Sequence, residues 1–131
     1  GELYARRLKI MQFYEEAFAG NKYLVPLKTR AGVQSSYHLY VIQLNLETLS
    51  IGRDEFINAL SERNIGTSVH YAPIHTHSYY AKKYGWKPES FPNAYRAFTR
   101  MLSLPLNSKM DVCDAADVVN AVEDICARFK R

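Results

Sequence analysis

Side chains that could do chemistry gather in one short segment of the sequence. The twelve residues from Val69 to Tyr80 contain three of the four histidines and three tyrosines. A brief strand is predicted over 67–71, at the start of this segment. Pro73 must end the strand because proline has no backbone N–H to donate to a sheet. A strand that opens into a loop is a common mount for binding residues. The segment is therefore a candidate binding site, and the alternative that its rings only wedge the loop against the sheet stays open.

A metal centre is the first chemistry to weigh for this segment. Imidazole is the commonest metal ligand, and His70, His75 and His77 are close together in the sequence. Their spacing does not match a helical zinc motif, Pro73 interrupts the segment, and no Cys, Asp or Glu joins it. The sequence therefore predicts no metal site.

Other catalytic patterns are also incomplete. No serine lies in a glycine-bounded elbow, neither cysteine has a histidine beside it, and neither common glycine-rich phosphate loop is present. The residues alone name no catalytic group.

The basic charge of the chain is spread along it. The formal net charge is +4, but the basic residues near Arg6, Lys82 and Arg128 are interrupted by acidic or apolar residues. We therefore expect a solvated surface and no nucleic-acid partner, with a phosphate-binding stripe as the alternative.

Length and composition predict one folded domain in a reducing compartment. With 131 residues, 47% of them hydrophobic, the chain can bury a single core. Cys113 and Cys126 are too few for a disulfide framework, and Cys126 is expected in the core.

No apolar run is long enough for a membrane span, and no signal-peptide pattern is present. We expect a cytoplasmic protein, and the opening at Gly1 suits a segment of a longer one.

The positioning elements follow from hydrophobic periodicity. Apolar stripes predict helices over 2–19, 53–63 and 111–130, and short apolar runs predict strands over 35–46, 67–71 and 101–106. Gly85 as a stop and Pro92 as a first helical residue indicate two further short helices over 78–84 and 92–100. The apolar run over 35–46 is expected at the centre of the sheet with both faces covered, while 23–34 reads as irregular. This order predicts an α+β fold in two layers, with helices packed on a small sheet of about three strands.

Four short segments together resemble a known family. They are Ser-Ser-Tyr-His-Leu-Tyr at 35–40, Arg-Asp-Glu-Phe at 53–56, Gly-Thr-Ser-Val-His-Tyr-Ala-Pro-Ile-His at 66–75 and Leu-Ser-Leu-Pro-Leu at 102–106. Their wording, order and spacing resemble the C-terminal region of the DegT-type nucleotide-sugar aminotransferases. The resemblance runs from Leu3 to the last helix and is most specific over 66–80.

The resemblance implies the small domain of a fold-type-I, pyridoxal 5'-phosphate-dependent aminotransferase. Such enzymes are usually homodimers that move an amino group from glutamate to a keto group of a nucleotide-linked sugar. In this reading residues 1–20 form an interdomain linking helix and 21–131 the small α+β domain. The Schiff-base lysine and most cofactor ligands belong to an N-terminal domain outside this chain. We therefore nominate no catalytic residue, and expect the chain alone to bind no cofactor and to be inactive.

The resemblance also nominates substrate contacts. His70 matches the family's histidine at the strand end and would face the nucleotide-sugar side of the cleft, with Tyr71 and His75 as weaker neighbours. His38 matches a family position too, but a satisfied core histidine is the expected role. A non-catalytic α+β binding or regulatory module that shares these short motifs is the alternative function. The sugar, the nucleotide and the product are left open.

Overall fold

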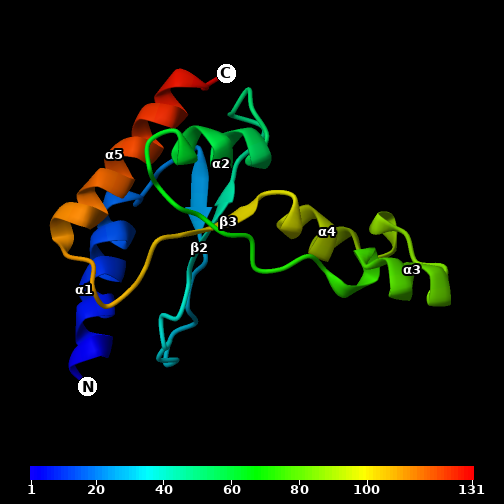
Figure 1. The fold of residues 1–131 in the computed structure, drawn as a ribbon, viewed down its shortest axis with the longest axis horizontal. Helices are drawn as coiled ribbons and strands as arrows, with labels where there is room; N and C mark the ends of the chain where they lie inside the picture. Colours follow the sequence, from blue (N-terminus) through cyan, green and yellow to red (C-terminus); the bar gives the residue numbers. More distant parts are fainter.

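A small antiparallel sheet lies at the centre of the protein (Figure 1). The computed structural model describes residues 1–131. The strands are β1 (Leu24–Pro26), β2 (Tyr40–Leu44) and β3 (Met101–Leu104), in the spatial order β1–β2–β3. β2 is the central strand, as predicted. The predicted α+β fold with helices on a three-stranded sheet is confirmed.

The central strand is shorter and less covered than the sequence indicated. Tyr40, Ile42 and Leu44 are buried, while the alternate residues Val41 and Gln43 are only partly buried. The strand therefore packs one face on the helices, as antiparallel sheets commonly do, and the prediction of two covered faces was wrong. Residues 35–39 form no strand, and Tyr37 has a φ of 46°, which is incompatible with an extended chain.

Two of the strand positions were also predicted wrongly. β1 comes from the stretch expected to be irregular, and Pro26 is tolerated there because β1 is an edge strand. The predicted strand over 67–71 contributes one bridge, in which the Ser103 N–H donates to the Ser68 carbonyl at 2.7 Å. The chain then leaves the sheet at His70.

Three helices cover the buried face of the sheet. They are α1 (Glu2–Ala17), α2 (Arg53–Ser61) and α5 (Val112–Arg128). α1 packs along α5, and α2 contacts both α5 and β3 (Figure 1). Their apolar stripes meet the sheet in a continuous core that includes Ile10, Tyr14, Phe56, Leu60, Val118, Val122 and, as predicted, Cys126. No helix combines the length and the apolar character that crossing a membrane requires.

A projecting arm, residues 71–99, extends away from this body (Figure 1). It contains η1 (Ile74–Thr76), α3 (Ser78–Tyr84), η2 (Pro88–Ser90) and α4 (Pro92–Phe98). α3 ends at Gly85 as predicted, because the φ of 67° there is a left-handed conformation that favours glycine. The elements of the arm contact mainly one another, so the arm is a separate packing unit.

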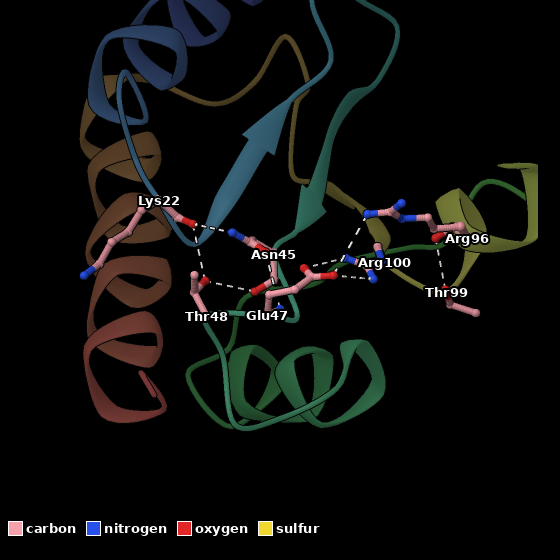
Figure 2. A network of polar contacts seen from close by, with 7 residues as sticks. All are labelled: Lys22, Asn45, Glu47, Thr48, Arg96, Thr99 and Arg100. Atoms are coloured by element: carbon pink, nitrogen blue, oxygen red, sulfur yellow. Dashed lines mark hydrogen bonds and ion pairs between the residues drawn. The ribbon is translucent and has the colours of Figure 1, made fainter.

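An ion-pair network joins Arg100, the residue that follows the arm, to the loop after β2 (Figure 2). The Arg100 guanidinium donates to both carboxylate oxygens of Glu47, at 2.8 and 2.9 Å, and Arg96 lies 4.0 Å away. The hydrogen bonds from Arg100 are the main reason that the pKa of Glu47 falls from 4.5 to about 2. On the other side of this loop, Asn45 donates to the Lys22 carbonyl at 3.0 Å.

The core should respond to truncation far more strongly than the open sheet face. We expect Leu102→Ala, at a fully buried position on β3, to lower the free energy of unfolding by about 2–5 kcal/mol because it leaves a cavity. The control Val25→Ala, on β1 with 56% of the residue exposed, should change it by about 0.5 kcal/mol or less. Urea unfolding of both variants measures this. A single cooperative transition is expected for the unmodified chain, and similar losses in both variants would contradict the assignment of the core.

The Glu47–Arg100 pair predicts a pH dependence of stability with a definite sign. Because the pKa of Glu47 is lower in the folded state, the pair stabilises the fold above about pH 4.5 and loses its effect as the pH falls towards about 2. The difference in Tm between the unmodified chain and Glu47→Gln should therefore shrink over that range. Glu62→Gln, which alters an exposed carboxylate outside the ion pairs, is the control and should show no such convergence. A constant Tm difference for Glu47→Gln would refute the linkage.

Candidate functional site

His70 lies where the chain leaves the edge of β3. Its side chain is partly buried, and Nδ1 lies 2.9 Å from the hydroxyl oxygen of Ser103. The imidazole lines a pocket of about 170 Å³, which is room for a single chemical group and not for a whole nucleotide sugar. Its wall is completed by residues from three segments, namely His38, Leu39, Gly66, Thr67, Ser68, Ser103, Leu104, Pro105 and Leu106.

The pocket also contains a histidine that the sequence placed elsewhere. His38 is exposed and lines the pocket together with His70. The expectation of a core histidine was wrong because residues 35–39 are not part of β2. The pocket floor is braced from the body, since the Tyr14 hydroxyl donates to the Pro105 carbonyl at 2.9 Å. Burial is the main cause that raises the pKa of Tyr14 well above its ordinary value.

Tyr71 stays beside His70 but points into solvent. The two rings meet edge to face, with 4.9 Å between centroids and planes 87° apart. Tyr71 is 75% exposed. The structure therefore brings two of the three predicted contact residues together and leaves the tyrosine ring accessible.

His75 is placed differently from its two predicted neighbours. It is 5% exposed, its Nε2 donates to the Pro88 carbonyl at 3.2 Å, and its ring lies 4.9 Å from that of Phe91. These contacts join η1 to η2 inside the arm. In this arrangement His75 holds the arm together and does not line the pocket of His70.

The three histidines of the segment do not converge. His77 donates from Nε2 to the Ala72 carbonyl at 3.2 Å, while His70 and His75 have the separate partners already described. Across the chain, no three His, Cys, Asp or Glu side chains are grouped so that they could hold a metal ion.

Two features of the site were missed from the sequence. The first is Ser103, the only polar residue in its short apolar strand. A lone polar residue in an apolar strand indicates a buried side chain with a hydrogen-bond partner, which here is His70. The second is a row of stacked aromatic rings along the arm, in which Tyr80 and Tyr84 are 6.4 Å apart and Tyr84 and Trp86 are 4.6 Å apart. The spacing of four residues between Tyr80 and Tyr84 on a predicted helix could have indicated this stack.

The lysines do not form a cofactor site within this chain. All eight are exposed, at positions 9, 22, 28, 82, 83, 87, 109 and 130. A lysine that forms a Schiff base needs a pocket that desolvates or otherwise activates its amine. Pyridoxal phosphate therefore does not fit the lysines of this chain, and we derive no chemical step through it.

The family follows from a comparison with known proteins. A family profile described as the DegT/DnrJ/EryC1/StrS aminotransferase family matches residues 1–123. The chain belongs to this family. Because the match extends over most of the chain, family membership explains the short motifs. The alternative, an unrelated binding module that shares these motifs by chance, is not needed.

Individual relatives agree with this assignment. The chain is 42% identical over 120 residues to an uncharacterized protein of Methanocaldococcus jannaschii. The matched region covers 92% of the chain and 31% of that protein. It is 41% identical over 125 residues to the spore coat polysaccharide biosynthesis protein SpsC of Bacillus subtilis. That matched region covers 95% of the chain and 32% of SpsC.

The fold also matches solved structures of the family. A Streptococcus pneumoniae protein assigned as a sugar aminotransferase, solved in PMP and PLP forms, superposes with a TM-score of 0.85 at 28% identity. The superposition of the PMP form covers 96% of this chain and 31% of that one. The chain thus spans about a third of the length of the relatives it matches. It corresponds to the C-terminal, small domain of the family.

The packing of His75 can be tested through the single tryptophan. We expect His75→Ala to loosen the arm by about 1–3 kcal/mol, because it removes a buried hydrogen bond and a ring contact to Phe91, which itself packs on Trp86. The Trp86 emission should shift to longer wavelength while the main unfolding transition of the core changes little. His77→Ala, at an exposed position in the same segment, is the matched control. Unchanged emission in His75→Ala would show that the ring does not hold the arm.

Proposed function

We propose that this chain forms one wall of the substrate cleft of a pyridoxal-phosphate-dependent sugar aminotransferase. In the complete protein, an amino group would pass from glutamate to the keto group of a nucleotide-linked sugar. The observation that carries the proposal is that His70 lines a pocket in a chain that belongs to an aminotransferase family. Its Nδ1 is engaged by Ser103, whereas its Nε2 makes no hydrogen bond to the protein.

The chemistry available to this wall is recognition. The imidazole can form a hydrogen bond with a phosphate or sugar oxygen, and the exposed Tyr71 ring beside it supplies an apolar face with a hydroxyl at its end. The bound cofactor would supply the electron sink for transamination. His75 contributes by shaping the arm that begins at Tyr71.

The cofactor and its lysine are placed outside this chain in the proposal. Support comes from the exposure of all eight lysines and from the share of the relatives' length that the chain spans. The proposed nucleotide-sugar acceptor is in keeping with the polysaccharide role in the name of SpsC.

The domain organisation belongs to the same proposal. We assign residues 1–20 as the linking helix between domains and 21–131 as the small domain. Leu3, which is 63% exposed near the start of α1, is the kind of apolar side chain that a second domain would cover. A homodimer of the complete protein and a cytoplasmic location remain predictions.

The proposed function is tested with the full-length protein. We expect it, loaded with pyridoxal phosphate, to convert glutamate to 2-oxoglutarate in the presence of a keto nucleotide sugar. The 131-residue chain treated with the cofactor and borohydride should yield no stoichiometric, site-specific lysine adduct. Such an adduct, or a full-length protein inactive towards every keto nucleotide sugar in a broad panel, would overturn the proposal.

Within that enzyme, His70→Ala should reduce kcat/KM for the nucleotide sugar more than it reduces stability. Loss of a hydrogen bond to a charged group costs about 1.5–3 kcal/mol, or about ten- to a hundredfold in kcat/KM. His77→Ala is the matched control because that side chain is exposed and bonded only within its own segment. If His70→Ala lowers Tm but leaves kcat/KM intact, His70 is structural and does not contact substrate.

A further inference from the structure

We propose that Ser103 is a positioning residue that fixes the neutral His70 ring in the tautomer with its proton on Nε2. The ring then presents an N–H donor to the pocket. The catalytic relevance of this arrangement rests on the proposed function, whereas the arrangement itself can be measured in the chain alone.

The backbone holds Ser103 in place from both sides. Ser103 is opposite Val41 of β2, and on its other side it exchanges two hydrogen bonds with Ser68, at 2.7 and 3.3 Å. Side chains alternate along a strand, so Ser103 points away from the face on which Leu102 and Leu104 are buried. That direction leads to His70, and a residue paired on both edges has little freedom to move from it.

Hydrogen-bond accounting then decides which atom donates. Ser103 is 5% exposed, and the only side-chain partner of its hydroxyl is His70 Nδ1 at 2.9 Å. If Nδ1 carried the proton and donated to the hydroxyl oxygen, the hydroxyl hydrogen would have no acceptor in the protein. An unsatisfied buried donor is unfavourable. The hydroxyl therefore donates to Nδ1, and the proton of the neutral ring lies on Nε2.

The remaining nitrogen is free for a ligand. His70 Nε2 has no hydrogen bond to the protein, while the ring borders the pocket with His38 and Thr67. A donor at this position fits an oxygen acceptor of the substrate, such as a phosphate or hydroxyl oxygen of a nucleotide sugar. It does not fit a ligand N–H. Ser103 thus selects the chemical class of the group that His70 can bind.

Imidazole ¹⁵N NMR of the chain tests the inference. At a pH where His70 is neutral, long-range ¹H–¹⁵N correlations should show a protonated Nε2 and an unprotonated Nδ1 far downfield of it. In Ser103→Ala the two shifts should move towards each other, because both tautomers become populated. Ser103→Thr should retain the wild-type pattern because it keeps a hydroxyl.

The matched control is Ser68→Ala, which removes a hydroxyl from the other side of the same bridge without removing the partner of His70, and it should leave the His70 shifts unchanged. A proton on Nδ1 in the unmodified chain would overturn the inference, as would a folded Ser103→Ala variant with unchanged shifts. If Ser103→Ala fails to fold, the spectra of the unmodified chain and Ser103→Thr still decide. Failure of this inference can be distinguished from failure of the proposed function, because the tautomer is measured without cofactor or turnover.

Discussion

The pairing of β3 with the segments on both sides is the constraint on which the rest of this structure depends. On one side, Ile42 and Val41 of β2 pair with Leu102 and Ser103. On the other side, the single bridge to Ser68 sets the point at which the chain leaves the sheet. Both ends of the arm are therefore fixed to the same short strand, since the arm follows His70, which contacts Ser103, and ends two residues before Met101. Displacing β3 would disturb the core, the arm and the His70 pocket together.

The body and the arm are stabilised by different physics. The body depends on burial of apolar side chains, such as Leu60 and Val122, between helices and one face of the sheet. The arm is held by aromatic stacking, the buried His75 and the ion pair of Glu47 with Arg100 at its base. Since Glu47 is largely exposed, screening by water keeps the interaction energy of that pair small. Its main effect is to orient the base of the arm.

This division suits the proposed role of the domain in substrate recognition. The arm projects from the well-packed sheet (Figure 1). The pocket of His70 lies where the chain passes from the sheet to the arm, so the sheet can fix the ring while the arm presents exposed aromatic surface nearby. Ser103 belongs to the fixed part and Tyr71 to the arm. A hydrogen-bond donor held by the core and an adjacent accessible ring would make a selective but incomplete binding surface, consistent with a domain that spans about a third of its relatives.

The sequence by itself determined the features that depend on neighbours in the chain. Apolar periodicity located α1, α2 and α5, while Gly85 as a helix stop and Pro92 as a first helical residue located α3 and α4. The four short motifs over 35–40, 53–56, 66–75 and 102–106 were together enough to indicate the family, which the family profile confirms. They also placed His70 and Tyr71 at the end of the sheet, whereas their contacts with substrate remain a proposal.

Only the tertiary structure decided the features that join distant residues. Periodicity could not show that β1 completes the sheet, that residues 35–39 leave it, or that His38 faces the pocket, because each depends on what lies opposite in space. The burial of His75 follows from contacts with Pro88 and Phe91, on the far side of α3. The 2.9 Å contact between His70 and Ser103 spans 33 positions. A hydrogen bond of that kind is set by strand register, and register is fixed by the whole core.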